Sequence, residues 1–228
     1  MIAPIIYYTI KGAIWYQGEA NRNEYNEYAA LLTEMVAGWR KDFGCGNFPF
    51  YFVQIAPFKY DKSLDIVAAL QRDEQQKAMS MIPNSGMIST IDLGEENCIH
   101  PAEKLTVAKR LSYWALAETY NFTGFSYKMP VYKSMIVTDS VATLTFENTA
   151  KGLTNMGREI DCFEIAGADK IFYPAKYTIN KQTTVLLQSK QVKTPVAVRY
   201  AFRNFHVTRG YLYNTAGLPV PSFRTDDW

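Results

Sequence analysis

Polar side chains follow three apolar segments that the sequence predicts to be buried strands. Gln17, Glu19 and Asn21 follow the first segment, Gln54 ends the second, and His100 lies shortly after the third. Ligand sites in open α/β sheets form beyond the carboxyl ends of the strands. We therefore expect these five residues to lie at one edge of a sheet and to form an active site there.

His100 is the first candidate for acid–base chemistry. It lies in a predicted loop, among acidic residues and just before a helix. Histidine titrates near neutral pH, which suits a general base. A local role, such as capping the helix, fits the sequence equally well. The other histidine, His206, lies among Arg203, Asn204 and Arg209, and we predict an ordinary surface residue there.

Asn21 and Glu19 lie in the predicted turn between the first strand and the first helix. A side-chain amide at this place could donate a hydrogen bond to a developing oxyanion. The alternative is helix initiation, for which asparagine is also favoured. Glu19 could orient a base or bind sugar hydroxyls, and its alternative is a solvated acid.

The first half of the chain alternates strand and helix patterns. The predicted strands cover residues 10–17, 49–56 and 86–92, and the predicted helices cover 24–41, 65–80 and 101–120. Asn23 is a candidate N-cap for the first helix, and Pro101 suits the first turn of the third. This alternation predicts parallel strands with flanking helices. Because three parallel strands make a thin sheet, we also expect a further part of the sheet upstream.

The pattern changes near Gly124, where short β-branched or alternating runs begin. They cover residues 135–138, 141–146, 160–166, 183–188 and 195–202. Turn residues separate these runs, which is typical of an antiparallel β-sandwich. The prediction is an α/β fold with two domains, an α/β domain over residues 1–125 and a smaller β-rich module over 126–228.

Composition excludes several classes of protein. The net charge of the 228 residues is only +2 and no segment concentrates Lys and Arg, so the chain lacks the basic surface that nucleic acids require. No apolar run approaches the roughly 20 residues that span a bilayer, and residues 1–10 do not resemble a signal peptide. The three scattered cysteines indicate neither a disulfide scaffold nor a zinc site. No glycine-rich cofactor loop is present, so no cofactor is predicted.

Several motifs in consecutive order resemble one enzyme family. They are IWYQGEAN (14–21), GWRKDFG (38–44), PFYFVQIAPF (49–58), QRDEQ (71–75), IHPAEKLTVAKRL (99–111) and YLYNTAGLPVPSFRTD (211–226). This series, which extends over essentially the whole chain, resembles the carboxyl-terminal part of the sialate 9-O-acetylesterase family of SGNH hydrolases. The resemblance implies a partial SGNH, flavodoxin-like sheet and a carbohydrate O-acetylesterase that uses serine and histidine.

The resemblance also assigns roles to residues. It implies that His100 is the base, that Asn21 is an oxyanion donor, and that Glu19 of the QGE motif is the acid that orients His100. Glu95, Glu96 or a backbone carbonyl are alternatives for that last role, because Asn97 occupies the position at which many SGNH enzymes have an aspartate. The predicted substrate-binding residues are Gln17, Gln54 and Arg72.

The nucleophilic serine of the family has no counterpart here. Ser85 precedes a predicted strand instead of following one, which does not fit a nucleophile turn, and Cys98 is better interpreted as an idle thiol. We therefore expect a fragment with its serine upstream and an exposed sheet edge that favours homo-oligomers. A non-catalytic carbohydrate-binding or structural module and an acetyl xylan esterase are the alternatives. Family members usually act outside the cytoplasm.

Overall fold

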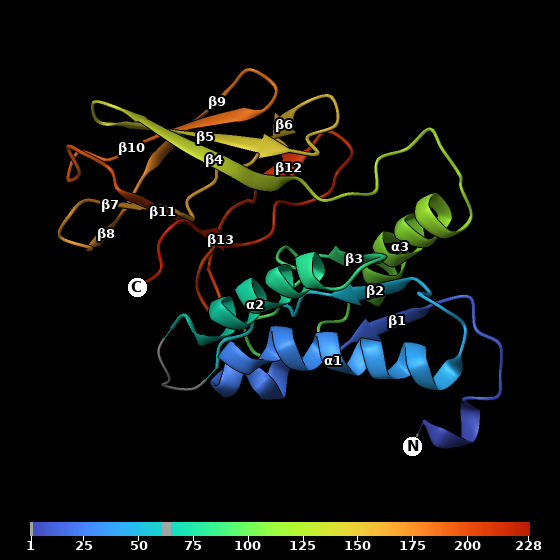
Figure 1. The fold of residues 1–228 in the computed structure, drawn as a ribbon. Coiled ribbons are helices and arrows are strands. Elements are labelled where there is room, and N and C mark those ends of the chain that lie inside the picture. The colour runs from blue at the N-terminus through green and yellow to red at the C-terminus, as the bar shows by residue number, and fades with distance from the viewer. Residues whose placement is uncertain (1, 61–64) are drawn as a thin grey trace.

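The computed structural model describes residues 2–60 and 65–228, which form an α/β body followed by a β-rich module (Figure 1). The body contains a parallel sheet of order β1-β2-β3. Its strands are Ala13–Tyr16 (β1), Phe50–Val53 (β2) and Ser85–Ile88 (β3), and its helices are Tyr25–Phe43 (α1), Val67–Met81 (α2) and Lys104–Trp114 (α3). Short helical turns cover Ala3–Ile5, Glu19–Glu24 and Ala115–Thr119. The predicted α/β class is confirmed.

Helices cover both faces of this sheet, which explains why β2 is apolar at every position. Phe50 and Phe52 face the cluster made with α1 and α2. Tyr51 and Val53 point the other way, towards α3, where Trp114 lies against Gly86 of β3. A methyl group on Gly86 would come within 2.4 Å of the Trp114 ring, so glycine allows this close packing.

Two helix starts differ from the sequence prediction. Asn23 lies inside the Glu19–Glu24 turn, and α1 begins after Glu24 without a side-chain cap. The third helix begins at Lys104 instead of Pro101, and Glu103 precedes it. In both places the residues that local propensity assigns to the helix precede it, in the Glu19–Glu24 helical turn and in the irregular segment 101–103.

The β-rich module is a sandwich of two antiparallel sheets around one core. One sheet has the order β4-β5-β10-β9, formed by Val131–Thr138, Val141–Glu147, Thr184–Gln188 and Lys176–Asn180. The other has the order β13-β11-β7-β8, formed by Phe223–Arg224, Ala197–Tyr200, Phe163–Ala166 and Phe172–Pro174. A two-stranded ribbon pairs Leu153–Thr154 (β6) with Tyr213–Asn214 (β12). The predicted antiparallel class of this half is thus observed.

The module is bonded directly to α2. Asn204 accepts a hydrogen bond from the backbone N–H of Ala68 at 2.7 Å, and Arg224 pairs with Asp73 at 3.1 Å. Arg72 donates to Ser222 Oγ at 3.0 Å and to the carbonyl oxygen of Arg203. These contacts fix the module beside the carboxyl ends of the strands.

Both edges of the parallel sheet carry no strand partner in the described part of the chain, and one of them is the more exposed. This edge is formed by β1, which pairs only with β2. The Ile14 side chain of β1 is 67% exposed. Across residues 2–60 and 65–228, no helix has the length and apolar character needed to cross a membrane.

Candidate active site

The turn after β1 is built around Gly18. Its φ angle of 146° is one that residues with a side chain rarely adopt. A Cβ atom there would lie 2.9 Å from Gln75 Nε2 and 3.1 Å from Ile55 Cγ2. Glycine therefore lets the chain turn sharply against α2, and this turn places Glu19 and Asn21 at the sheet edge.

Gln17 orients Asn21. Gln17 Nε2 donates to Asn21 Oδ1 at 2.6 Å, and Tyr28 Oη donates to the carbonyl oxygen of Gln17 at 3.0 Å. Because the oxygen of the Asn21 amide is held by Gln17, its NH2 group is left to face another acceptor. Within the described residues that NH2 group has no partner. An oxyanion donor needs this arrangement, with a fixed amide and a free N–H.

Gln75 joins the ends of β1 and β2, and sequence reasoning missed it. Its Nε2 donates to the carbonyl oxygens of Gln17 at 3.1 Å and Val53 at 3.3 Å, and its Oε1 accepts from the N–H of Ile55 at 2.8 Å. The side chain is fully buried. Gln71 and Gln75 are four residues apart in α2, and both are buried. Such a polar pair on the buried side of a helix was the signal available in the sequence.

Gln54 and Arg72 both lie at the carboxyl edge, and both are fully buried. Gln54 Nε2 donates to the carbonyl oxygen of Arg72 at 3.0 Å, and its Oε1 accepts from Ser89 at 2.8 Å. Burial lowers the pKa of Arg72 to about 10. In the described structure, Gln54 and Arg72 are therefore buried groups bonded to other parts of the protein. A direct contact of either residue with the substrate stays a prediction.

His100 lies in the loop between β3 and α3 and is exposed. Among the described residues its imidazole makes no hydrogen bond or ion pair, although its backbone carbonyl accepts from Cys98 Sγ at 3.3 Å. A base waiting for a nucleophile would have its ring nitrogens free in this way. The role of His100 as a base stays a prediction.

Three acids were candidates to orient His100, and two of them are bonded elsewhere. Glu96 forms an ion pair with Lys59 at 2.8 Å, and Glu95 accepts from the N–H of Ala102 at 2.7 Å. The half-buried Glu19 carboxylate has no such partner in the described part of the chain. Burial, together with the charge of Glu19, raises the pKa of Tyr16 to about 12. Glu19 is thus the acid that remains available.

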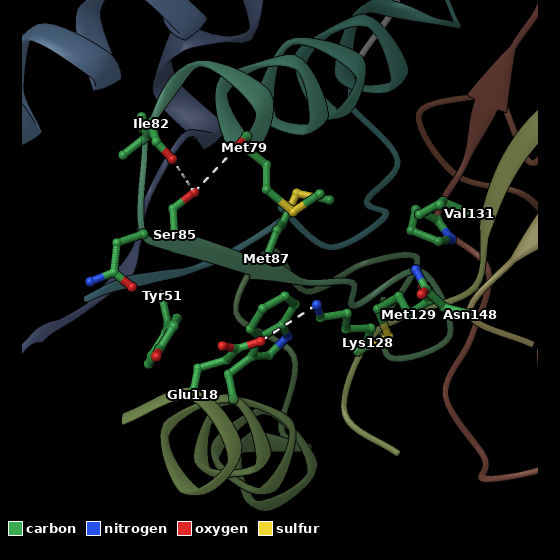
Figure 2. A pocket seen from close by; sticks show the side chains of 13 residues that line it. Tyr51, Met79, Ile82, Ser85, Met87, Glu118, Lys128, Met129, Val131 and Asn148 are labelled. Atoms are coloured by element: carbon green, nitrogen blue, oxygen red, sulfur yellow. Dashed lines mark hydrogen bonds and ion pairs between the residues drawn. The ribbon is translucent and has the colours of Figure 1, made fainter. Parts of the chain in front are cut away.

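A different cavity lies at the opposite end of the sheet, where β3 begins (Figure 2). It has a volume of about 380 Å³, and the ion pair of Glu118 and Lys128, at 3.4 Å, lies on its wall. Ser85 lines it but donates to the carbonyl oxygens of Ile82 at 2.7 Å and Met79 at 3.2 Å. These bonds occupy the hydroxyl hydrogen of Ser85, which argues against a nucleophile. No cluster of three or more potential metal ligands occurs in the residues that the structure describes.

Comparison with known proteins shows which family the chain resembles. Residues 3–113 match the family described as carbohydrate esterase, sialic acid-specific acetylesterase. The chain is 30% identical to sialate O-acetylesterase of Mus musculus and 32% identical to that of Rattus norvegicus, over 98% of its own length in each case. A solved carbohydrate acetylesterase from Xanthomonas citri superposes on 100% of the chain with a TM-score of 0.90 and 34% identity.

The chain is similar to this carbohydrate esterase family over residues 3–113. It spans about half the length of its relatives, covering 46% of the mouse protein, 45% of the rat protein and 52% of the Xanthomonas chain. The residues that match the sialic acid-specific acetylesterase family include all the predicted site residues, namely Gln17, Glu19, Asn21, Gln54, Arg72 and His100. The β-rich module lies beyond the matched segment.

Proposed function

We propose that the whole protein is a carbohydrate O-acetylesterase that removes O-acetyl groups from sialic acid or a related acetylated sugar. Relatives that match 98% of the chain are named sialate O-acetylesterase. The observation that carries the proposal is the fixed Asn21 amide beside Gly18, with its oxygen held by Gln17 and its NH2 group without a partner in residues 2–60 and 65–228. Acyl transfer requires such a donor at the carbonyl oxygen.

The proposed mechanism is acyl transfer through a serine that this chain does not supply. His100 takes the proton of that serine, whose oxygen attacks the acetyl carbonyl carbon. Asn21 donates to the resulting oxyanion, and Glu19 holds the His100 ring. The bond to the sugar oxygen then breaks, and His100 returns the proton to that oxygen. Water attacks the acetyl-serine in the same way and releases acetate.

The test is acetate release from 9-O-acetyl-N-acetylneuraminic acid. We expect the chain by itself to release none, and a longer protein that includes an upstream serine segment to be active. In that protein, Asn21→Ala should lower kcat by about 10²–10³-fold, as loss of one oxyanion donor does, and His100→Ala should abolish turnover. Release by the chain alone that depends on His100 would place the nucleophile within these residues.

A non-catalytic carbohydrate-binding role is the second candidate for the chain by itself. It is favoured by the bonding of Ser85, whose hydroxyl donates to backbone carbonyls. Sugar binding without acetate release, in both the chain and the longer protein, would support this role over the esterase.

The same proposal implies a substrate, a location and a surface for self-association of the whole protein. We infer an acetylated carbohydrate as substrate and, by the resemblance to its family, a location outside the cytoplasm, which cell fractionation would test. The free edge of β1, with its exposed Ile14, is the proposed surface for self-association.

A further inference from the structure

A cleft lies between the loop that leads to His100 and the β-rich module. It has a volume of about 630 Å³. One wall contains Asp92, Gly94 and Glu96, which follow β3, and the other contains Arg158 and the segment 205–211. The first wall thus belongs to the same loop as His100, between β3 and α3, and the module supplies the second wall. His206, predicted to be an ordinary surface residue, lines this second wall.

Most charged groups that line the cleft are neutralised by a partner. Asp92 accepts two hydrogen bonds from Arg110, at 2.7 and 2.6 Å, and Glu96 pairs with Lys59 at 2.8 Å. Arg209 forms an ion pair with Glu159. Arg158 is the exception, since its guanidinium has no ion pair or hydrogen bond within residues 2–60 and 65–228. The cleft therefore presents one uncompensated positive charge.

The wall that carries Arg158 is held in place by its neighbours. A Cβ atom on Gly210 would lie 2.7 Å from Arg158 Cβ and 3.2 Å from the carbonyl oxygen of Glu159, so the two segments are in close contact. Thr208 donates to Asp161 and also to the carbonyl oxygen of Gly210 at 2.9 Å. The backbone that positions Arg158 is thus fixed before any ligand arrives, which lowers the entropic cost of binding.

We propose that Arg158 binds the carboxylate of an acidic sugar in this cleft and thereby selects acidic over neutral substrates. The inference rests on the proposed function and specifies its substrate class. A guanidinium matches a carboxylate with two parallel hydrogen bonds. The volume of the cleft falls in the usual range of about 300–1,000 Å³ for small-molecule sites. The Tyr211 and Tyr213 side chains on the same wall offer ring surface to the sugar.

The experiment is a calorimetric titration of the chain with N-acetylneuraminic acid and, separately, with its uncharged methyl ester. We expect the acid to bind about tenfold more tightly, as hydrogen bonds to a charged group predict. Arg158→Gln should remove this preference and leave binding of the ester unchanged. Arg209→Gln is the matched control, because Arg209 lines the same cleft but is neutralised by Glu159, and it should keep the preference.

Each other outcome would overturn the inference. These are equal binding of acid and ester, binding of neither at millimolar concentration, and an equal loss of preference in both variants. Both sugars lack an O-acetyl group, so the result does not depend on catalysis. A preference that requires Arg158, in a protein whose longer form releases no acetate, would keep the acidic-sugar site and reject the esterase.

Discussion

At the scale of single residues, the candidate site depends on amides more than on charges. Gln17 holds Asn21, and Gln75 holds the backbone of the two strands that lead to the site. An amide donates and accepts at once, so a short chain of amides can satisfy a buried turn without the desolvation cost of charged groups. Glu19, whose carboxylate has no partner among the described residues, is the charged residue that this arrangement leaves available for chemistry.

Substitution of Glu19 tests its role at this scale. In the longer, active protein, Glu19→Gln should lower kcat, because a neutral amide cannot stabilise a protonated His100 as a carboxylate does. Glu96→Gln is the matched control, since Glu96 was also a candidate to orient His100 but pairs with Lys59. Steady-state kinetics with 9-O-acetyl-N-acetylneuraminic acid measure both. Unchanged kcat in Glu19→Gln would remove Glu19 from the mechanism.

Gly18 should be intolerant of even a methyl group. We expect Gly18→Ala to lower the free energy of unfolding by about 1–3 kcal/mol, since its φ of 146° is strained for alanine and the Cβ would meet Gln75 at 2.9 Å. Urea denaturation measures this. As control, Gly38→Ala lies in α1 with nothing within 4 Å of the new Cβ. It should be stabilising by about 0.5–1 kcal/mol. Equal stability of the two variants would contradict the strain argument.

At the scale of elements, the parallel sheet is covered on both faces but lacks strand partners at both edges, β1 and β3, in the described part of the chain. The central strand β2 is buried at all four positions, whereas β1 on the outside is only partly covered. An exposed edge strand offers unpaired N–H and C=O groups to another strand. The two strands therefore experience different surroundings although both are short and apolar.

The open edge predicts concentration-dependent association through β1. Sedimentation velocity of the chain should show dimers or larger species as concentration rises, and Ile14→Lys should shift the distribution towards monomer, because a charge on an edge strand opposes pairing. Leu105→Lys is the matched control, since Leu105 on α3 is 66% exposed and Ile14 is 67% exposed. A monomeric wild type, or the same shift in both variants, would argue against this edge as the interface.

At the scale of the whole molecule, the β-rich module stabilises the helix that supports the site. The backbone N–H of Ala68, at the start of α2, donates to the side chain of Asn204, 136 residues further on. Asn204 is only 2% exposed. A helix start needs acceptors for its first N–H groups, and here a distant residue provides one.

Removal of that distant acceptor should destabilise the protein. We expect Asn204→Ala to cost about 1–3 kcal/mol, because the N–H of Ala68 would stay buried without a partner. Asn26→Ala, on the exposed side of α1, is the control and should lie within about 0.5 kcal/mol of wild type. Thermal and urea unfolding measure both variants. A stable Asn204→Ala protein would show that α2 does not need the module for its start.

The sequence alone determined the order and type of the main elements. The predicted helix over 65–80 is observed as Val67–Met81, and the predicted strand over 49–56 contains Phe50–Val53. These are local properties, since the spacing of apolar residues and the positions of Gly and Pro depend on neighbours along the chain. The change to antiparallel strands in the second half was predicted on the same basis, while the domain boundary near residue 125 stays a prediction.

Only the tertiary structure decided which polar residues meet. Gln75 bonds to Gln17 and Val53, Asn204 bonds to Ala68, and Arg158 faces a cleft whose other wall follows β3. These pairs are tens of residues apart or more, and no periodic pattern relates them. A buried polar side chain needs a hydrogen-bond partner, and that partner can come from any segment that the fold brings next to it. The sequence could therefore indicate the edge where the site forms, and only the packing of sheet, helix and module could determine which groups remain free for chemistry.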